Sequence, residues 1–182
     1  MSDIIFETKR LILRQWRDED IPLMAKINQD KIVMEHFPAL KTYQETEKFV
    51  RANMRLHSNG ELCLYAVELK DTREFTGFIG LLQVDFNLPF IPAVEILWRI
   101  GSKYWSKGYA FEAAIAVCDY AFNDKHLKEL VSFTVPANVR SVKLMERLGF
   151  VHDPIYDFDH PNISLDNRLS RHVFYRLINR NA

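Results

Sequence analysis

The chain has 182 residues, 48% of them hydrophobic, and its 24 lysines and arginines balance 24 aspartates and glutamates. This length suits one domain, expected over residues 1–182, that buries roughly 70% of the unfolded surface. The zero net charge gives no bulk attraction to nucleic acid or to an acidic membrane, so neither is expected as a partner. The start of the chain has no signal-peptide pattern and no apolar stretch approaches the length of a membrane span, so a cytoplasmic protein is expected.

The two cysteines, Cys63 and Cys118, lie far apart in the sequence. They form no CxxC spacing, and no histidine stands in metal-ligand register with them. Both are therefore expected to be core thiols, and no metal site is expected.

The first elements are predicted from alternating apolar residues, caps and turns. A strand is expected over residues 10–14, followed by a helix with Asp18 as its N-cap. Thr42 and Glu45 have the spacing of a capping box and predict the start of a second helix. The residues expected on its apolar face are Tyr43, Val50 and Met54.

The rest of the chain predicts a meander followed by alternating strands and helices. A helix with two buried faces is expected after Gly108, because apolar residues recur there in two stripes, the second of which contains Ile115. Asn138 is expected as the N-cap of a further helix that stops at Gly149. The expected strands cover residues 62–69, 75–84, 94–100, 130–135, 151–158 and 172–178. This order predicts a three-layer α/β/α sandwich with a mixed, mostly antiparallel sheet of about six to seven strands.

The most informative stretch is residues 104–113, a basic turn with a glycine that opens a helix. A helix start leaves backbone N–H groups without internal partners and carries a partial positive charge, so it can bind an anion. Small residues at Gly108 and Ala110 would let a pyrophosphate approach the backbone. Neither the P-loop nor the dinucleotide-binding glycine pattern is present, and a single glycine at a helix start is often only a turn.

A second motif follows about thirty residues later, with Asn138, Ser141 and the run at residues 148–150. Together the two motifs resemble those of the GNAT superfamily of acyl-CoA N-acyltransferases, most closely its RimJ/RimL-like branch. The resemblance covers nearly the whole chain. The family's pyrophosphate pattern, Q/R-x-x-G-x-G/A, falls on residues 105–110, where Trp105 takes the place of Gln or Arg.

The resemblance implies the acyl-CoA N-acyltransferase fold, in which the fourth and fifth strands, residues 94–100 and 130–135 here, splay apart. The pantetheine arm of acetyl-CoA, the implied cosubstrate, would lie in this gap like an added strand. The main chain of Trp98 and Ile100 would hold its amides, and Asn138 would close the other side. The residues implied to contact the cosubstrate are Trp98, Ile100, Trp105, Ser106, Lys107, Gly108, Tyr109, Ala110, Asn138 and Ser141.

Basic side chains near the two motifs have two interpretations. They can form a rim for the phosphates of coenzyme A, or they can be ordinary solvated surface. These side chains are Lys103, Lys107, Arg140, Lys143 and Arg147.

The implied chemistry is direct transfer of the acetyl group to an amine in a ternary complex, so the protein must align two substrates and move protons. Glu95 is the candidate base, and strand alternation puts it on one face with Leu97 and Arg99. Alternatively, Glu95 is a surface glutamate or an ion-pair partner of Arg99, and a water chain takes the proton. Met145 stands where the family often has the tyrosine that protonates the leaving thiolate. Ser141 is therefore a second catalytic candidate, for contacting the thiol or a bridging water, or else it is only a polar residue of the first helical turn.

Loops around residues 35–38, 85–92 and 157–161 are expected to line the mouth for the acceptor. The resemblance implies an acyl-CoA-dependent N-acetyltransferase acting on a primary amine, either a protein N-terminus or a small molecule. The alternative is a non-catalytic acyl-CoA-binding sensor or carrier, suggested by the missing tyrosine. The chain is expected to be a monomer or a homodimer, since the C-terminal strand could offer an apolar edge.

Overall fold

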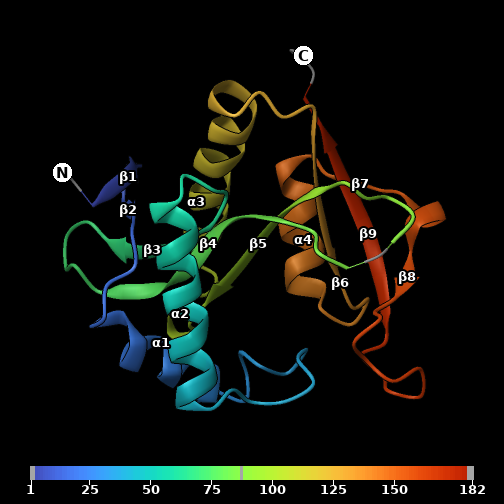
Figure 1. Ribbon diagram of the computed structural model, residues 1–182, viewed down its shortest axis with the longest axis horizontal. Helices are drawn as coiled ribbons and strands as arrows, with labels where there is room; N and C mark the ends of the chain where they lie inside the picture. Colours follow the sequence, from blue (N-terminus) through green and yellow to red (C-terminus); the bar gives the residue numbers. More distant parts are fainter. Residues whose placement is uncertain (1–2, 87, 180–182) are drawn as a thin grey trace.

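The computed structural model describes residues 3–86 and 88–179, so the ends of the expected domain, residues 1–2 and 180–182, lie outside the described part (Figure 1). The α-helices are α1 (Asp20–Gln29), α2 (Tyr43–Ser58), α3 (Tyr109–Asp119) and α4 (Val139–Leu148). The strands are β1 (Ile4–Glu7), β2 (Leu11–Arg14), β3 (Leu64–Leu69), β4 (Phe75–Gln83), β5 (Val94–Ile100), β6 (Glu129–Thr134), β7 (Val151–His152), β8 (Phe158–Asp159) and β9 (Arg171–Ile178).

The strands follow the order β1-β2-β3-β4-β5-β6-β9-β7, and β8 also pairs with β9. All pairs are antiparallel except β5 and β6, which confirms a mixed, mostly antiparallel sheet. The expected number of strands is too low. β1 is too short to show alternation in the sequence, and the strand expected over residues 151–158 is interrupted by a 3-10 turn that begins at Pro154, which has no N–H to donate to a ladder.

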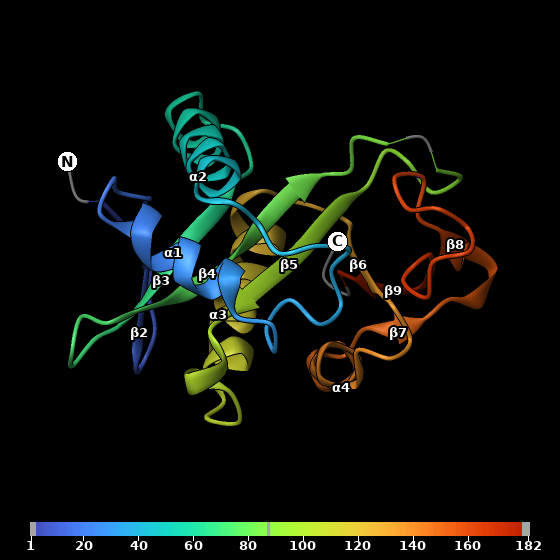
Figure 2. The same ribbon diagram turned by 90° about the horizontal axis from the view of Figure 1, so that it is seen from below.

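Helices cover both faces of the sheet, which confirms the three layers. Figure 2 shows α1 and α2 on one side of the sheet and α3 and α4 on the other. Met24 of α1 and Val50 of α2 belong to the apolar core on the first side, and Val117 of α3 and Met145 of α4 belong to the larger core on the second. No helix in the described part of the chain is both long and apolar enough to cross a membrane.

The start of α1 differs from the expectation. Asp18 is not the N-cap: Glu19 occupies that position without a side-chain cap bond, and the helix begins at Asp20. The Asp20 carboxylate accepts a hydrogen bond from the backbone N–H of Arg17 at 2.8 Å, and the helix starts one residue later than the sequence pattern indicates.

The start of α2 confirms the capping box, but its inner face is more polar than expected. Tyr43 is 49% exposed, and Thr46 and Asn53 are buried in its place. Asn28 donates to the Thr46 hydroxyl at 2.9 Å, and the Asn53 side-chain oxygen accepts from the backbone N–H of Leu64 at the same distance. These bonds connect α2 to α1 and β3. The pattern of apolar residues in the sequence cannot predict them, because the side chains involved are polar.

The second stripe expected in the helix after Gly108 is only partly buried. Ile115 is 42% exposed, whereas Cys118 in the same stripe is 7% exposed and belongs to the larger core. Cys118 in the same helix and Cys63 before β3 are buried free thiols, as expected.

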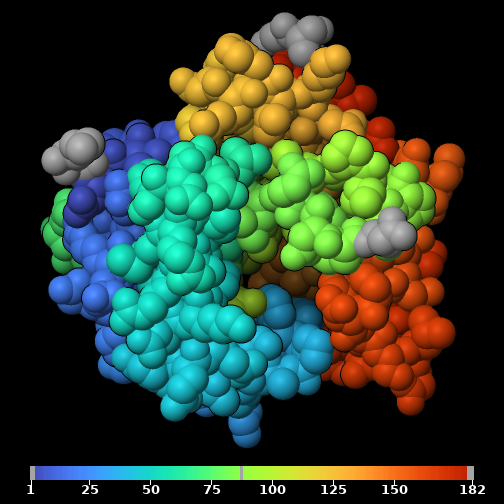
Figure 3. Space-filling view, in the orientation of Figure 1, coloured from blue at the N-terminus to red at the C-terminus, as the bar shows by residue number. Residues whose placement is uncertain are grey.

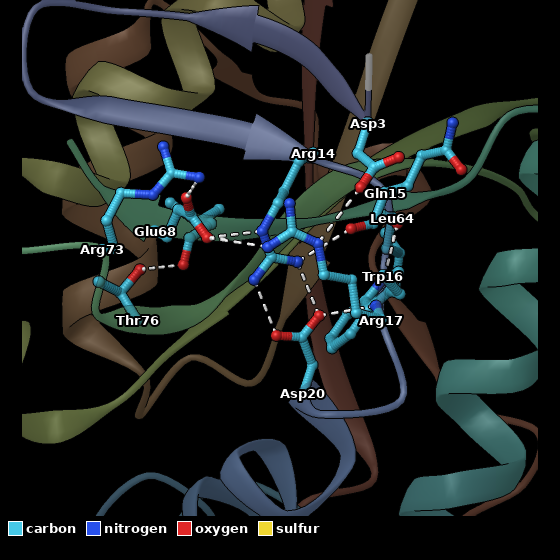
Figure 4. Close-up of polar contacts among 11 residues, drawn as sticks. Asp3, Arg14, Gln15, Trp16, Arg17, Asp20, Leu64, Glu68, Arg73 and Thr76 are labelled. Atoms are coloured by element: carbon cyan, nitrogen blue, oxygen red, sulfur yellow. Dashed lines mark hydrogen bonds and ion pairs between the residues drawn. The ribbon is translucent and has the colours of Figure 1, made fainter. Parts of the chain in front are cut away.

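A buried cluster of charges fastens the N-terminal hairpin (Figure 4). Arg14, at the end of β2, donates through both terminal nitrogens to Asp20 at 2.7 and 2.8 Å and through Nε to Glu68 at 2.6 Å. Arg73 reaches the other Glu68 oxygen at 2.7 Å. Since Arg14, Asp20 and Glu68 are each 2–3% exposed, this network connects β2, α1 and β3 in a place where an unpaired charge would be costly.

Candidate active site

The turn before α3 presents a row of free backbone amides. Ser106 and Gly108 both have positive φ, at 61° and 79°, and Gly108 precedes the helix without any side-chain cap. The first N–H of this helix with an internal acceptor is that of Glu112, bonded to the Gly108 carbonyl at 3.0 Å. No described residue accepts from the N–H groups of residues 106–111, so the sequence-predicted turn can bind an anion through its backbone.

Arg10 and Glu112 hold this turn in place. The Arg10 guanidinium donates to the Lys107 carbonyl at 2.9 Å and to Glu112 at 2.6 Å, and it lies 4.7 Å from the centre of the Tyr109 ring. Thr8 donates to the other Glu112 oxygen at 2.6 Å. Burial alone would raise the pKa of Glu112, but the hydrogen bonds from Thr8 and Arg10 outweigh it and lower that pKa. Arg10 was expected only as the first residue of a strand over residues 10–14, so its role at the turn was missed.

The main chain of β5 faces a gap. The Gly101 N–H donates to the Thr76 carbonyl at 2.8 Å, so Ile100 and Gly77 form a non-hydrogen-bonded pair. By the alternation of an antiparallel ladder, the N–H and C=O groups of Trp98 and Ile100 both point away from β4, toward β6. The Ile100 carbonyl accepts one bond there, from the indole nitrogen of Trp105 at 2.7 Å.

On that side, β6 lies beside β5 over only a small part of its length. Glu95 and Val131 form the one registered pair between β5 and β6 among the described residues. Trp98 and Ile100 lie three and five positions beyond this pair, where β6 no longer follows β5. The splay implied by the resemblance is therefore present, between the strands that are labelled β5 and β6.

A cavity of about 400 Å³ joins the free amides to this gap. Two predicted residues do not line it, Glu95 and Lys107. The predicted residues that line it are Trp98, Ile100, Trp105, Ser106, Gly108, Tyr109, Ala110, Asn138 and Ser141.

The start of α4 closes the cavity opposite β5. The Asn138 side chain accepts from the Ser141 N–H at 3.4 Å and donates to the Thr134 hydroxyl at 3.0 Å, which confirms the N-cap. None of the described residues bonds to the Ser141 hydroxyl. Met145, at the position of the family tyrosine, is fully buried in the core and has no proton to give.

The basic side chains divide between the two interpretations. Arg140, Lys143 and Arg147 of α4 line the cavity, as a rim for phosphates requires. Lys103 instead pairs with Glu74 at 3.3 Å, and the Lys107 side chain lies outside the cavity wall.

Glu95 is half-buried on the face of the sheet that α1 and α2 cover. Burial, and then the charge of Asp85, raise the pKa of its carboxyl from 4.5 to about 8. The alternative of an ion pair with Arg99 is wrong, because Arg99 donates to the Asn28 side-chain oxygen at 2.6 Å and has no carboxylate partner among the described residues. Glu95 is therefore a poorly solvated carboxyl at the point where the gap opens.

Three loops surround a hollow on this same face, seen near the centre of Figure 3. Arg168 joins two of them by donating to the Glu35 carbonyl at 2.8 Å. The rings of Phe86 and His160 lie 5.0 Å apart and join the third. The bordering loops cover residues 30–42, residues 84–86 with 88–93, and residues 160–170.

Comparison with known proteins identifies the family. Residues 10–151 match the Acetyltransferase (GNAT) domain. The uncharacterized protein YkkB of Bacillus subtilis is 30% identical over 143 residues, which cover 78% of this chain and 82% of YkkB. The uncharacterized N-acetyltransferase YnaD of the same bacterium is 29% identical, with 78% of this chain and 79% of YnaD covered. The ribosomal protein uS5-alanine N-acetyltransferase of Escherichia coli is 29% identical over 97 residues, with 52% and 47% covered.

Solved structures share the fold along nearly the whole chain. A GNAT-family acetyltransferase from Bacillus anthracis superimposes with a TM-score of 0.77 at 25% identity, covering 94% of this chain and 96% of that one. RimL, a ribosomal-protein acetyltransferase solved with coenzyme A, gives 0.77 at 17% identity, with 96% and 97% covered. A spermidine N-acetyltransferase from Vibrio cholerae, solved with CoA and spermine, gives 0.71 at 17% identity, with 92% and 95% covered.

These matches agree with the geometry of the site: free amides at a helix start, a splayed parallel pair and a cavity that connects them. The chain belongs to the GNAT acetyltransferase family, in its RimJ/RimL-like branch, and is an acyl-CoA-dependent N-acetyltransferase that acts on an amine.

Proposed function

We propose that this protein transfers an acetyl group from acetyl-CoA directly to a primary amine, with both substrates bound at once. The observation that carries the proposal is the continuity between the free amides of residues 106–111 and the unpaired backbone of β5. The first suits a diphosphate and the second suits the amides of a pantetheine arm. A bound acetyl-CoA supplies the activated acyl group as a thioester.

The cosubstrate fits the residues present. The backbone of residues 106–111 would hold the diphosphate, with the side chains of Arg140, Lys143 and Arg147 adding positive charge at the rim. Trp98 and Ile100 would bind the pantetheine arm through their main chains, and Asn138 would close the opposite side. The CoA complexes of RimL and the spermidine acetyltransferase support this assignment, since both share the fold.

Glu95 would take the proton of the attacking amine. A pKa of about 8 places the carboxyl near the operating range of a general base at neutral pH, where it accepts a proton more readily than an ordinary glutamate. Because Glu95 lies on the α1–α2 face, the acceptor would enter through the hollow between the three loops, and a water molecule can relay the proton.

Ser141 would contact the departing thiolate or a water bound to it. Ser141 lines the cavity, and its hydroxyl bonds to none of the residues that the structure describes. A thiol with a pKa of roughly 8 to 9 leaves with little acid assistance, so the loss of the family tyrosine at Met145 is compatible with turnover.

The acceptor would be either a protein N-terminus or a small amine. Two relatives are named for the first class, as ribosomal-protein acetyltransferases, and one for the second, as a spermidine acetyltransferase. The hollow on the α1–α2 face is open to solvent in Figure 3 and is compatible with both.

The test is release of free thiol from acetyl-CoA in the presence of peptides and small amines, with the acetylated product identified by its gain in mass. Glu95→Gln is expected to lower kcat by about 10²- to 10⁴-fold while calorimetry shows unchanged acetyl-CoA binding. Glu19→Gln, at an exposed carboxyl in the N-cap position before α1, is the matched control. Binding without turnover for every amine would favour the non-catalytic carrier, and absence of binding would refute both functions.

A further inference from the structure

Arg99 is a cation in the cavity wall, and none of the described residues places a carboxylate against it. Its guanidinium donates to the Asn28 oxygen at 2.6 Å and lies 4.1 Å from the ring centre of Phe37 and 5.6 Å from that of Phe78. The Nε atom is buried without a hydrogen-bond acceptor, and no acceptor for Nη2 is found in the described part of the chain. Burial alone lowers the pKa of Arg99 to about 10, since no carboxylate counteracts it.

The lack of a carboxylate partner distinguishes Arg99 from the other charged side chains that have a buried, unbonded atom. Glu68 has such an oxygen, but it lies 2.7 Å from Arg73, and Arg176 has such a nitrogen, but its terminal nitrogens pair with Glu129 and Asp153. Burying a charge without a partner costs several kcal/mol, so a protein that keeps one in a cavity has the electrostatics of an anion-binding site.

The position of Arg99 indicates which substrate carries the anion. Strand alternation puts it on the α1–α2 face with Glu95, whereas α3 and its free amides lie on the other face. The phosphates of coenzyme A have their own partners there and at the α4 rim, where Arg140 lies. An anion at Arg99 would therefore arrive with the acceptor.

We propose that Arg99 binds a carboxylate of the acceptor, so that the acceptor class is an amine carrying a carboxylate several bonds from the reactive nitrogen. This inference rests on the proposed function. At a strand rise of about 3.3 Å per residue, the Cα atoms of Glu95 and Arg99 are about 13 Å apart. A free α-amino acid is too short to reach both, whereas a short peptide or a long ω-amino acid spans them.

The experiment compares acceptors that differ only in the carboxylate. The probes are the dipeptide alanylalanine and its C-terminal amide, and ω-amino acids from glycine to 6-aminohexanoate with their amides. For the wild type, kcat/KM is expected to be at least about tenfold higher for the acid than for the amide, and highest for the longer probes. Arg99→Gln removes this preference without changing KM for acetyl-CoA, and Arg99→Lys retains part of it.

Two controls separate the possible failures. Arg140→Gln is expected to raise KM for acetyl-CoA while the acid-to-amide ratio stays, which distinguishes a coenzyme A phosphate from an acceptor carboxylate as the anion. If no probe is acetylated, calorimetry on the protein saturated with coenzyme A measures the same acid and amide pairs directly. Equal binding of acid and amide overturns the carboxylate site, whereas absence of acetyl-CoA binding overturns the proposed function itself.

The melting temperature of the Arg99→Gln variant shows whether Arg99 has only a structural role. Removing a half-buried charge that has no carboxylate partner among the described residues is expected to leave the melting temperature of Arg99→Gln unchanged or higher. A lower melting temperature together with an unchanged acid-to-amide ratio would assign Arg99 to packing against Phe37 and Phe78, and would contradict the proposal.

Discussion

Arg10 and Glu112 meet across 102 positions of sequence: the backbone N–H of Arg10 donates to one Glu112 oxygen at 2.7 Å and its Nε donates to the other at 2.6 Å. The same guanidinium donates to the Lys107 carbonyl. The N-terminal hairpin therefore holds the turn of free amides without any of its own side chains lining the cavity.

Replacement of Arg10 should weaken acetyl-CoA binding. Arg10→Ala is expected to raise KM for acetyl-CoA by about three- to tenfold, because the turn loses a charge-assisted bond to its carbonyl, and to change kcat less. The neighbouring Lys9→Ala serves as the control, since Lys9 is exposed. Steady-state kinetics with acetyl-CoA varied at fixed amine measures both; an equal effect of the two variants would contradict the role given to Arg10.

Glu95 should make stability depend on pH. Its folded-state pKa of about 8 lies above the ordinary value of 4.5, so between these pH values the folded protein binds more protons than the unfolded one. The stability contributed by this group is then complete below about pH 4.5 and is lost as the pH rises through 8. Glu95→Gln, which cannot ionise, is expected to match the wild type near pH 4 and to become progressively more stable than it up to about pH 8. Thermal denaturation at several pH values measures this difference, and a constant difference would show that Glu95 titrates normally.

The buried charge cluster of Figure 4 should be important for stability. Arg14→Met leaves Asp20 and much of Glu68 without their partner and is expected to cost about 3 to 5 kcal/mol of unfolding free energy. Arg51→Ala, at a side chain 46% exposed whose Asp18 partner is 64% exposed, should cost less than about 1 kcal/mol. Urea denaturation measures both, and similar losses would mean that burial does not govern this cluster.

The link between Arg168 and Glu35 should matter to the acceptor and not to the cosubstrate. Arg168→Ala removes the bond that joins two loops of the hollow, so KM for the amine is expected to rise several-fold while KM for acetyl-CoA is kept. Arg171→Ala, which breaks an exposed pair with Asp159, is the comparison. A change in acetyl-CoA affinity alone would place Arg168 on the cofactor side of the cavity.

Local patterns predicted most of the elements and the cofactor side of the site. The capping box of α2, the left-handed Gly149 after α4 and the bounds of β5 agree with the structure because each depends on neighbours within a few residues. The amide turn and Asn138 were found in the same way. That residues 1–182 form one domain stays a prediction.

What the sequence could not predict are contacts between distant segments. The bonds of Arg10 to Glu112 and of Arg168 to Glu35 join positions 102 and 133 residues apart. The absence of a carboxylate partner for Arg99 among the described residues is equally invisible, because Glu95, four residues earlier on the same strand face, suggested an ion pair. Only the fold shows that the guanidinium turns to Asn28 and Phe37 instead.

Arg168 bonds to the main-chain oxygen of Glu35, so the bond depends on the side chain at position 168 but not on the side chain at position 35. Every amino acid supplies a carbonyl, so position 35 can change its side chain, 56% exposed beside the hollow, and still anchor the C-terminal loop. Position 168 cannot change in the same way, because the bond is made by the arginine side chain itself. Descendants of this protein could therefore alter their choice of amine by changing residue 35 while the architecture around it stays intact.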